Sequence, residues 1–231
     1  MNALLVTGTD TGVGKTFVAC ALVTALRQRG LRVAVMKPVE TGVQGKPEDA
    51  RALRAAAADP GPLDDICPYR FRAPLAPVVA ARLEGTTVDV ARLLALVARR
   101  RQGADILVIE GAGGLLVPLD ARTTYAELAA RGGLPVLIVG ANRLGTVNHC
   151  ALTARVAASA GLVVPGFVLS QTTPETDRSA ATNAETIATL TGLKCLGVLP
   201  HGTQDDAMRT LDLDLLTSDD QTVQRSGRSG R

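Results

Sequence analysis

The stretch Gly8-Thr-Asp-Thr-Gly-Val-Gly-Lys-Thr16 decides the fold of this 231-residue chain. It follows the apolar run Ala3-Leu-Leu-Val-Thr7, which predicts a buried strand, and it leads into a helical pattern from Lys15 to Gly30. A glycine-rich turn between a strand and a helix is the context of a phosphate-binding loop. Its glycines let backbone N–H groups face an anion, and the helix adds its positive end. The stretch therefore predicts a nucleoside triphosphate site.

Two side chains and two departures from the general loop pattern refine this prediction. Lys15 is expected to reach the β- and γ-phosphates, and the Thr16 hydroxyl is expected to hold Mg²⁺. The pattern G-x-x-x-x-G-K-[ST] has glycine where this chain has Thr9. The glycine spacing resembles a deviant P-loop group that includes partition-type ATPases, which carry a further lysine where this chain has Asp10. Asp10 therefore counts against an ATPase switch of that kind.

Short apolar runs alternate with helical patterns along the rest of the chain. Further strands are predicted at 32–36, 105–109, 135–139, 164–169 and 195–199, and further helices at 90–101, 147–161 and 178–190. Strands this short and apolar are buried on both faces, as in a parallel sheet covered by helices. We predict an α/β, single-domain P-loop NTPase-like fold over residues 1–216, with a mostly parallel, doubly wound sheet and helices on both faces. The polar stretch 217–231 is expected to be disordered.

Composition argues against several classes of function. Aromatic residues make up 2% of the chain and Trp is absent, which argues against a surface that stacks nucleic-acid bases. The net charge of +3 comes without a basic stripe, so no nucleic-acid partner is expected. No apolar stretch approaches the roughly 18 residues of a membrane span and no leader precedes the first strand, which indicates a cytoplasmic protein without membrane association. The four widely spaced cysteines are expected to be buried free thiols rather than zinc ligands.

Three polar residues lie where strands end or helices begin, on the side of the sheet that binds ligands. Lys37 ends the second strand; such a lysine is usually a solvated turn residue, but beside a phosphate loop we favour a second cation near the phosphates. Glu110 follows the strand 105–109, a position typical of a carboxylate that binds a metal ion. The glycines after it permit the backbone to approach a ligand closely. Asp49 opens a helix, either as a partner of the helix dipole or as a Mg²⁺ ligand, and its spacing leaves both interpretations open.

The segment Gly145-Thr-Val-Asn-His149 leads into another predicted helix. Its N–H groups are placed to bind a carboxylate, unless Thr146 is an ordinary N-cap of that helix. His149 is expected to be structural.

Taken together, these residues resemble the dethiobiotin synthetase family. The matching pieces run in order from residue 3 to about residue 200: Val6-Thr-Gly-Thr-Asp-Thr-Gly-Val-Gly-Lys-Thr16, Lys37-Pro-Val-Glu-Thr-Gly42, Pro68-Tyr69, Pro74 to Pro77, Val108-Ile-Glu-Gly-Ala-Gly-Gly114, Leu144-Gly-Thr-Val-Asn-His149 and Gly197-Val-Leu-Pro200. The loop combined with Lys-Pro-Val and Glu-Gly-Ala-Gly-Gly downstream is highly specific.

The resemblance implies an ATP-dependent ligase that closes a ring. In this family, 7,8-diaminononanoate, CO₂ and ATP, with Mg²⁺ as cofactor, give dethiobiotin, ADP and phosphate. One amine takes up CO₂ as a carbamate, the carbamate attacks the γ-phosphate to form a carbamic–phosphoric anhydride, and the second amine closes the ring and expels phosphate. Family members are homodimers with active sites at the interface.

Carried over by position, the resemblance assigns Lys37 and Lys15 to catalysis and Thr16, Asp49 and Glu110 to Mg²⁺. Nucleotide contacts are implied for Gly12, Val13, Gly14, Lys15, Thr16, Phe17, Asp49, Glu110, Gly111, Ala112, Gly113, Ser170, Gln171, Pro200, His201 and Gly202. Substrate contacts are implied for Thr11, Thr41, Gly145, Thr146, Val147 and Asn148. In family members, a loop like the one formed by the last four residues meets the substrate carboxylate across the dimer interface.

Departures from the family pattern bear on how the protein recognises the nucleotide base and the substrate. Ser170-Gln171 stands where many relatives have Asn-Asp, whose Asn contacts the adenine edge. A serine lacks the paired donor and acceptor of an amide, so backbone near Pro200 to Gly202 is the other source of base selectivity. Thr41 stands where relatives often have serine.

Two other functions remain as alternatives. A P-loop ATPase switch predicts a lysine at position 10, where this chain has Asp10. A cobyrinate-type amidating synthetase needs a glutamine-hydrolysing domain with a reactive cysteine, and the chain after residue 200 is too short for one. The ring-closing synthetase is the preferred interpretation.

Overall fold

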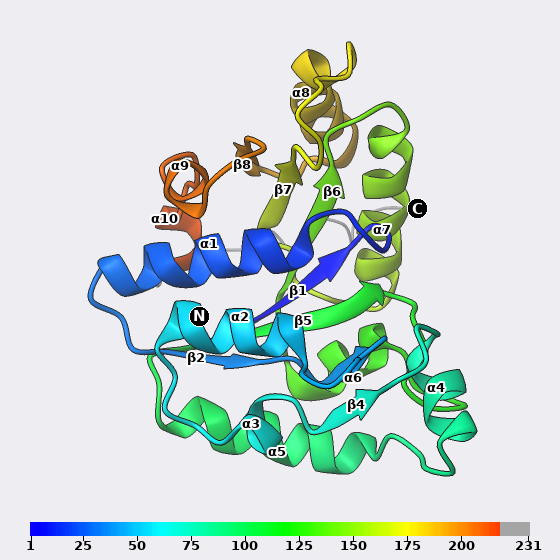
Figure 1. Cartoon of the computed structure of the whole chain (residues 1–231). Coiled ribbons are helices and arrows are strands. Elements are labelled where there is room, and N and C mark those ends of the chain that lie inside the picture. Colours follow the sequence, from blue (N-terminus) through cyan, green and yellow to red (C-terminus); the bar gives the residue numbers. More distant parts are fainter. Residues whose placement is uncertain (218–231) are drawn as a thin grey trace, which may run out of the picture.

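Six parallel strands form the central sheet of the computed structural model, which describes residues 1–217 (Figure 1). In spatial order they are β2 (Val33–Met36), β5 (Ile106–Gly114), β1 (Ala3–Gly8), β6 (Val136–Ala141), β7 (Gly166–Ser170) and β8 (Cys195–Leu199). Each neighbouring pair is parallel. Because the carboxyl ends of parallel strands meet at one edge, polar residues that follow different strands come together there.

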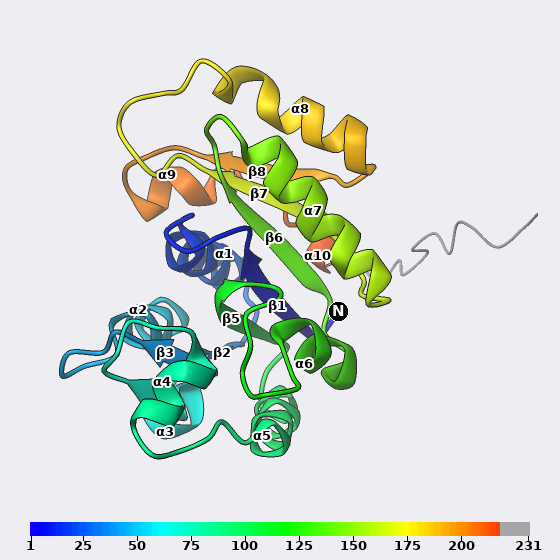
Figure 2. The same cartoon turned by 90° about the vertical axis from the view of Figure 1, so that its right-hand side faces the viewer.

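Helices cover both faces of this sheet, as Figure 2 shows. On one face lie α1 (Lys15–Gln28), α2 (Glu48–Ala57), α9 (Gln204–Met208) and the short α10 (Asp214–Thr217). On the other lie α5 (Val90–Gln102), α6 (Tyr125–Gly132), α7 (Thr146–Ser159) and α8 (Ala180–Thr191). The short helices α3 (Leu63–Ile66) and α4 (Pro77–Leu83) belong to the connection between β2 and α5. The predicted α/β fold with a doubly wound parallel sheet is therefore confirmed.

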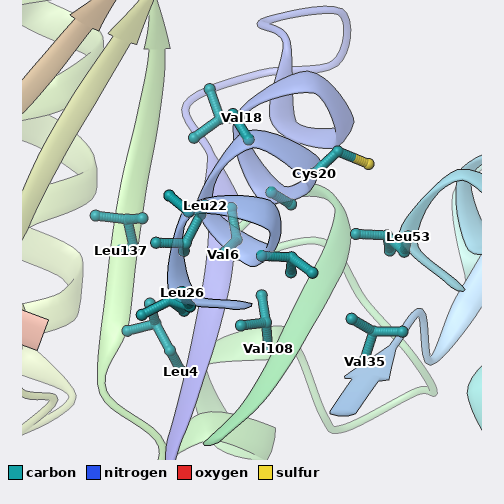
Figure 3. Packing of buried hydrophobic residues seen from close by; sticks show 14 of the residues in the cluster. Leu4, Val6, Val18, Cys20, Leu22, Leu26, Val35, Leu53, Val108 and Leu137 are labelled. Atoms are coloured by element: carbon teal, nitrogen blue, oxygen red, sulfur yellow. The ribbon is translucent and has the colours of Figure 1, made fainter. Parts of the chain in front are cut away.

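The core beneath α1 holds the phosphate loop in place. Leu4 and Val6 of β1 belong to the cluster on the α1 face, whereas Leu5 between them faces the opposite layer. Figure 3 shows Leu22 and Leu26 of α1 over Leu4 and Val6, and all four side chains are completely buried. Burying one leucine contributes about 2 kcal/mol, so this contact fixes the start of α1 against the end of β1.

β5 is longer than the sequence predicted. The strand predicted at 105–109 was expected to end before Glu110, but β5 continues to Gly114. Glu110 pairs with Val6 of β1, and Gly114 pairs with Gly8 beyond a shift in register, so the glycine run continues the ladder. A strand in the middle of the sheet, rather than a loop, therefore holds the carboxylate of Glu110.

Other strand boundaries differ by one or two residues. The strands predicted at 135–139 and 164–169 begin at Val136 and Gly166. Each start follows a proline, Pro135 or Pro165, which has no N–H to donate to a ladder. The strand predicted at 32–36 starts one residue late, at Val33, and the strand predicted at 195–199 is found at those bounds.

Helix boundaries shift for similar local reasons. The helix predicted at 147–161 covers Thr146–Ser159, and beyond its end Gly161 has a left-handed φ of 68°. The helix predicted at 178–190 starts at Ala180, after a turn in which Ser179 donates to the Asp177 carboxylate. The helix predicted from Lys15 ends at Gln28.

Periodicity did not predict several short elements. β3 (Val39–Thr41) and β4 (Tyr69–Phe71) form a separate parallel pair, and strands of three residues are too short to show alternation. The sequence pattern also missed α6, which begins with a capping box between Thr124 and Glu127.

Three further predictions concern the C-terminal stretch, membrane-spanning helices and the cysteines. The stretch 217–231, predicted to be disordered, lies outside the described residues apart from Thr217, where α10 ends. Among residues 1–217, none of the helices combines the length and apolar character needed to cross a membrane. All four cysteines are free thiols, three of them buried, while Cys195 is half-buried.

Candidate functional site

A cavity of about 750 Å³ opens where β1, β2 and β5 end. The phosphate loop and the start of α1 form one wall with Thr11, Gly12, Gly14, Lys15, Thr16 and Phe17. Other segments contribute Lys37, Thr41, Asp49, Glu110, Ala112 and Gly113. The fold thus gathers most of the residues that the sequence assigned to nucleotide, metal and catalysis into one cavity.

The backbone of the phosphate loop depends on two glycines. Gly12 has a φ of 74° and Gly14 a φ of 87°, both in the left-handed region. A Cβ on Gly14 would lie 2.6 Å from Ser170 Oγ, so a side chain there would also collide with β7. Gly14 is the N-cap of α1 and supplies no side-chain cap. The first N–H groups of the helix therefore remain free to bind an anion.

Lys15 lies buried at the end of this loop. Its Nζ donates a hydrogen bond to the carbonyl oxygen of Asp10 at 3.0 Å, so the side chain folds back over the loop. Burial lowers the pKa of Lys15 and the charge of Lys37 lowers it further, against the opposing influence of nearby carboxylates. Nearby carboxylates compensate the charge of Lys15 only in part, and an anion bound in the loop would pair with it.

Lys37 forms two ion pairs in the floor of the cavity. Its Nζ lies 2.5 Å from Glu110 Oε1 and 2.7 Å from Asp49 Oδ2, and its side chain is only 3% exposed. Burial alone would lower the pKa of Lys37, but the charges of Glu110 and Asp49 and their hydrogen bonds raise it above its usual value. Lys37 is therefore a fixed cation and is not available as a proton acceptor.

Thr16 joins the same group through its hydroxyl. Thr16 Oγ1 donates to Glu110 Oε1 at 2.8 Å, so this oxygen accepts from both Thr16 and Lys37. Glu110 Oε2 is buried and has no hydrogen-bond partner among the described residues. A buried carboxylate oxygen without a partner is costly in free energy. This oxygen is free to accept a cation.

The residues present fit a hard divalent cation. Asp49, Glu110 and Thr16 supply two carboxylates and a hydroxyl beside the phosphate loop, and Mg²⁺ prefers a few such oxygens together with phosphate oxygens and water. Burial tends to raise the pKa of Asp49, but Lys37, Thr16 and Lys15 together outweigh it and hold the pKa below the usual value, so the carboxylate is ionised. Within residues 1–217, no group of three or more His, Cys, Asp or Glu side chains is arranged to hold a metal ion, so this site would rest on two carboxylates and a hydroxyl together with phosphate oxygens and water.

Glu40 is a buried carboxylate beside this group that sequence reasoning missed. It lies on β3, lines the cavity and is 7% exposed. Its carboxylate accepts backbone N–H bonds from Asp49 at 3.2 Å and Ala50 at 3.0 Å. Burial raises the pKa of Glu40, although these two N–H bonds oppose the shift. A signal was present in the sequence, because Pro47 before α2 cannot cap that helix and Glu40 is a nearby acceptor.

A second, smaller cavity of about 280 Å³ adjoins the loop. Gly12, Gly14 and Phe17 line both cavities, and Ser170, Gln171, Thr172, His201 and Gly202 complete the smaller one. The ends of β7 and β8 thus form a compartment beside the phosphate loop. A nucleotide base could occupy this compartment. Gln171 Nε2 donates to the carbonyl oxygen of Glu175 at 2.6 Å. Pro200, predicted to contact the nucleotide, is exposed and lines neither cavity.

Some predicted residues are not gathered at the main cavity. Val13 and Gly111 are buried away from it. The predicted substrate segment Gly145 to Asn148 lines neither the main nor the smaller cavity of this single chain. Thr146 is not the N-cap of α7, because Gly145 holds that position with a φ of 96° and the Thr146 side chain turns inward to Cys150 Sγ at 3.8 Å. His149 is exposed on α7.

Solved structures share this fold at low sequence identity. Chloroplast FtsY from Physcomitrella patens superposes with a TM-score of 0.53 at 17% identity, covering 94% of this chain and 65% of that chain. The 54 kDa signal recognition particle protein from Aeropyrum pernix, solved with GDP, gives a TM-score of 0.52 at 17% identity over 89% of this chain and 42% of that chain. The present chain spans less than two thirds of either protein. At this identity the likeness establishes the P-loop NTPase-like fold alone.

Closer relatives are found among sequences. A family model described as an AAA domain matches residues 2–209. The ATP-dependent dethiobiotin synthetase of Anaeromyxobacter dehalogenans is 55% identical over 205 residues, covering 87% of this chain and 90% of that protein. The ATP-dependent dethiobiotin synthetase of Aquifex aeolicus is 44% identical over 191 residues, covering 83% of this chain and 86% of that protein. The chain therefore belongs to the ATP-dependent dethiobiotin synthetase family of ligases.

Proposed function

We propose that this protein carboxylates 7,8-diaminononanoate with CO₂ and closes the product to dethiobiotin, with ATP as the phosphoryl donor. The observation that carries the proposal is the contact of Lys37 with Glu110 and Asp49 directly beside the phosphate loop. A fixed cation and two carboxylates next to a triphosphate cradle suit the transfer of a phosphoryl group to an anionic acceptor. A carbamate is such an acceptor.

The chemistry proceeds in three balanced steps. One amine attacks CO₂ and loses a proton, which gives a carbamate. A carbamate oxygen then attacks the γ-phosphorus as the bond to ADP breaks, which gives a carbamic–phosphoric anhydride. The second amine attacks the carbonyl carbon, the C–O bond to phosphate breaks, and the proton leaves with phosphate as the five-membered urea closes.

In this scheme the side chains of this protein bind and orient the substrates and do not act as nucleophiles. Lys15 holds the β- and γ-phosphates, and Lys37 stabilises the charge that develops between the carbamate oxygen and the γ-phosphate. The charges of Glu110 and Asp49 raise the pKa of Lys37 and favour its protonated form. Thr11 and Thr41, which both line the cavity, offer hydroxyls to the diamine. The amines carry the nucleophilic electron pairs, so no protein nucleophile is needed.

Thr16, Asp49 and Glu110 would hold Mg²⁺, which would neutralise charge on the phosphate oxygens. The unpartnered Glu110 Oε2 supports this assignment. We further propose that the base of ATP occupies the compartment lined by Ser170, Gln171 and His201. Ser170 offers a single hydroxyl to the base, so selectivity for adenine would rest mainly on backbone groups near Gly202.

We also propose that the protein works as a homodimer in the cytoplasm. The segment Gly145 to Asn148 lies outside the cavity of its own chain, and its exposed residues Gly145 and Asn148 are accessible to the substrate carboxylate of a second subunit. Leu144 beside it is 78% exposed, and a second subunit that met this segment would cover it. Free thiols at all four cysteines are compatible with a reducing compartment.

The test is phosphate release from ATP and Mg²⁺ in the presence of bicarbonate, with and without diaminononanoate. Turnover is expected to depend on the diamine and to yield dethiobiotin by mass spectrometry; phosphate release at the same rate without the diamine would overturn the assignment. Bicarbonate labelled with ¹⁸O separately tests the anhydride, because the carbamate oxygen that attacks phosphorus must leave in the phosphate. Unlabelled phosphate under conditions of full turnover would contradict that route.

A further inference from the structure

α2 carries Asp49 in its first turn but has no cap from its own sequence. Its N-cap is Pro47, whose side chain makes no cap bond. The cap comes from Glu40, nine residues before Asp49, which accepts the N–H of Asp49 and, through its other oxygen, the N–H of Ala50. Both carboxylate oxygens of Glu40 are thus used at the start of α2, where a negative charge also suits the helix dipole.

The segment that carries Glu40 also carries Lys37. Lys37 stands between β2 and β3, and its N–H donates to the carbonyl oxygen of Ile66 at 2.7 Å. Glu40 follows on β3, which pairs with β4. The run from 37 to 41 therefore fixes both sides of the contact between Lys37 and Asp49. It places the ammonium directly, and it places the carboxylate through the cap on α2.

Asp49 needs such a restraint more than Glu110 does. Glu110 is held in a central strand and its side chain is 1% exposed, whereas the Asp49 side chain is 39% exposed. Asp49 is also in the first turn of its helix, where backbone groups lack internal partners. Loss of the cap would free the start of α2 and let the Asp49 carboxylate move away from Lys37 and Thr16.

We propose that Glu40 is a positioning residue of this site. By bonding the N–H groups of Asp49 and Ala50, it holds the Asp49 carboxylate where it meets Lys37 and where it would bind the divalent cation. The inference rests on the proposed function, which assigns Asp49 to that cation. It predicts that Glu40 controls metal affinity through the position of Asp49, because both of its own carboxylate oxygens are bonded to the start of α2.

The experiment compares Glu40→Ala and Glu40→Gln with a matched control, Asp89→Ala. Asp89 caps α5 by accepting the N–H of Arg92 at 3.0 Å, and it lies outside the cavity. Its loss removes a carboxylate cap of the same kind from a helix that carries no site residue. Mn²⁺ affinity is measured by electron paramagnetic resonance with a non-hydrolysable ATP analogue bound, and melting temperature is measured alongside.

Glu40→Ala is expected to weaken Mn²⁺ binding about tenfold, at the lower end of what outer-shell partners of a metal site contribute. Glu40→Gln should fall between Ala and wild type, because its amide oxygen can accept one of the two N–H bonds but its NH₂ cannot accept the other. Asp89→Ala should lower the melting temperature and leave Mn²⁺ affinity within about twofold of wild type.

Unchanged Mn²⁺ affinity in Glu40→Gln and Glu40→Ala would overturn the inference, as would an equal loss in Asp89→Ala. The glutamine variant keeps the size of the side chain, so the comparison stands even where the alanine variant fails to fold. The proposed function is judged independently on wild-type protein by diamine-dependent phosphate release. A wild type that is active, with Glu40 variants of normal metal affinity, would reject only the role of Glu40.

Discussion

Lys37 and Glu110 are 73 residues apart in the chain, yet Lys37 Nζ lies 2.5 Å from Glu110 Oε1. The register of β2 and β5 brings them together, since Met36 pairs with Ile109, Lys37 directly follows the end of β2, and Glu110 is the next residue of β5. Both side chains are almost completely buried. Neither charge is solvated by water, so removing one leaves the other as an uncompensated buried charge.

Lys37→Gln is expected to reduce turnover by at least about 100-fold, because one fixed positive charge at the transferring phosphoryl group is lost. The variant should also be less stable than wild type, because the buried Glu110 carboxylate keeps only the hydrogen bond from Thr16, so its fold is verified before its activity is compared. The measurement is diamine-dependent phosphate release, with circular dichroism to confirm folding. Lys194→Gln is the control, because Lys194 is an exposed lysine paired with Asp212 away from the cavity. Wild-type rates in Lys37→Gln would reject its role.

Glu110→Gln keeps the shape of the side chain and removes its charge. Mg²⁺ affinity should fall by at least the roughly 10–100-fold that loss of outer-shell partners causes, because a charged carboxylate that would bind the ion directly becomes a neutral amide. Isothermal titration of Mg²⁺ into the protein with a non-hydrolysable ATP analogue measures the effect. Glu127→Gln, on the exposed capping box of α6, serves as the control and should bind Mg²⁺ normally. Equal affinities in the two variants would contradict the assignment.

Gly14→Ala should be more harmful than Gly30→Ala, although both glycines have nearly the same φ, 87° and 84°. A Cβ at Gly30 meets nothing within 4 Å, so that variant costs only the strain of about 1–2 kcal/mol. A Cβ at Gly14 also meets Ser170 Oγ at 2.6 Å, and overpacking adds about 1–3 kcal/mol. Urea unfolding and ATP binding measure both variants. Adding Ser170→Ala should restore part of the loss in Gly14→Ala and none in Gly30→Ala.

The thiols should differ in reactivity. Burial raises the pKa of Cys20 and Cys67 to about 12 and that of Cys150 to about 11, so at pH 8 these groups hold almost no thiolate. Cys195 is only half-buried. Titration with a chromogenic disulfide reagent should therefore modify at most Cys195 in the folded protein and all four thiols in guanidinium. Rapid native labelling of three or four thiols would show that the buried thiols are more accessible than this structure indicates.

Leu144→Arg should weaken the proposed dimer. Leu144 is 78% exposed beside the segment proposed to meet a second subunit, and an arginine there would leave a charge in an apolar contact. Sedimentation equilibrium should give twice the chain mass for wild type and a shift towards the monomer for the variant. Leu190→Arg, on α8 and 56% exposed, is the matched control and should stay dimeric. A monomeric wild type would reject the dimer itself.

Local sequence was sufficient for much of the fold and for the phosphate loop. Gly12 and Gly14 specify a backbone that few other residues adopt, and the apolar runs on either side specify a strand and a helix. Strand ends were less well determined, as Glu110 demonstrates. Whether β5 stops or continues depends on pairing with Val6 and Gly8 of β1, which no local pattern contains.

The sequence by itself determined the loop, the alternation of strands and helices, and the resemblance to a family of synthetases, because each of these resides in short runs of adjacent residues. Only the tertiary structure decided that Lys37 bonds both Asp49 and Glu110, and that Glu40 rather than a neighbour of α2 caps that helix. Those contacts join residues from separate strands and a helix. They depend on sheet register and burial, which arise only when the chain has folded.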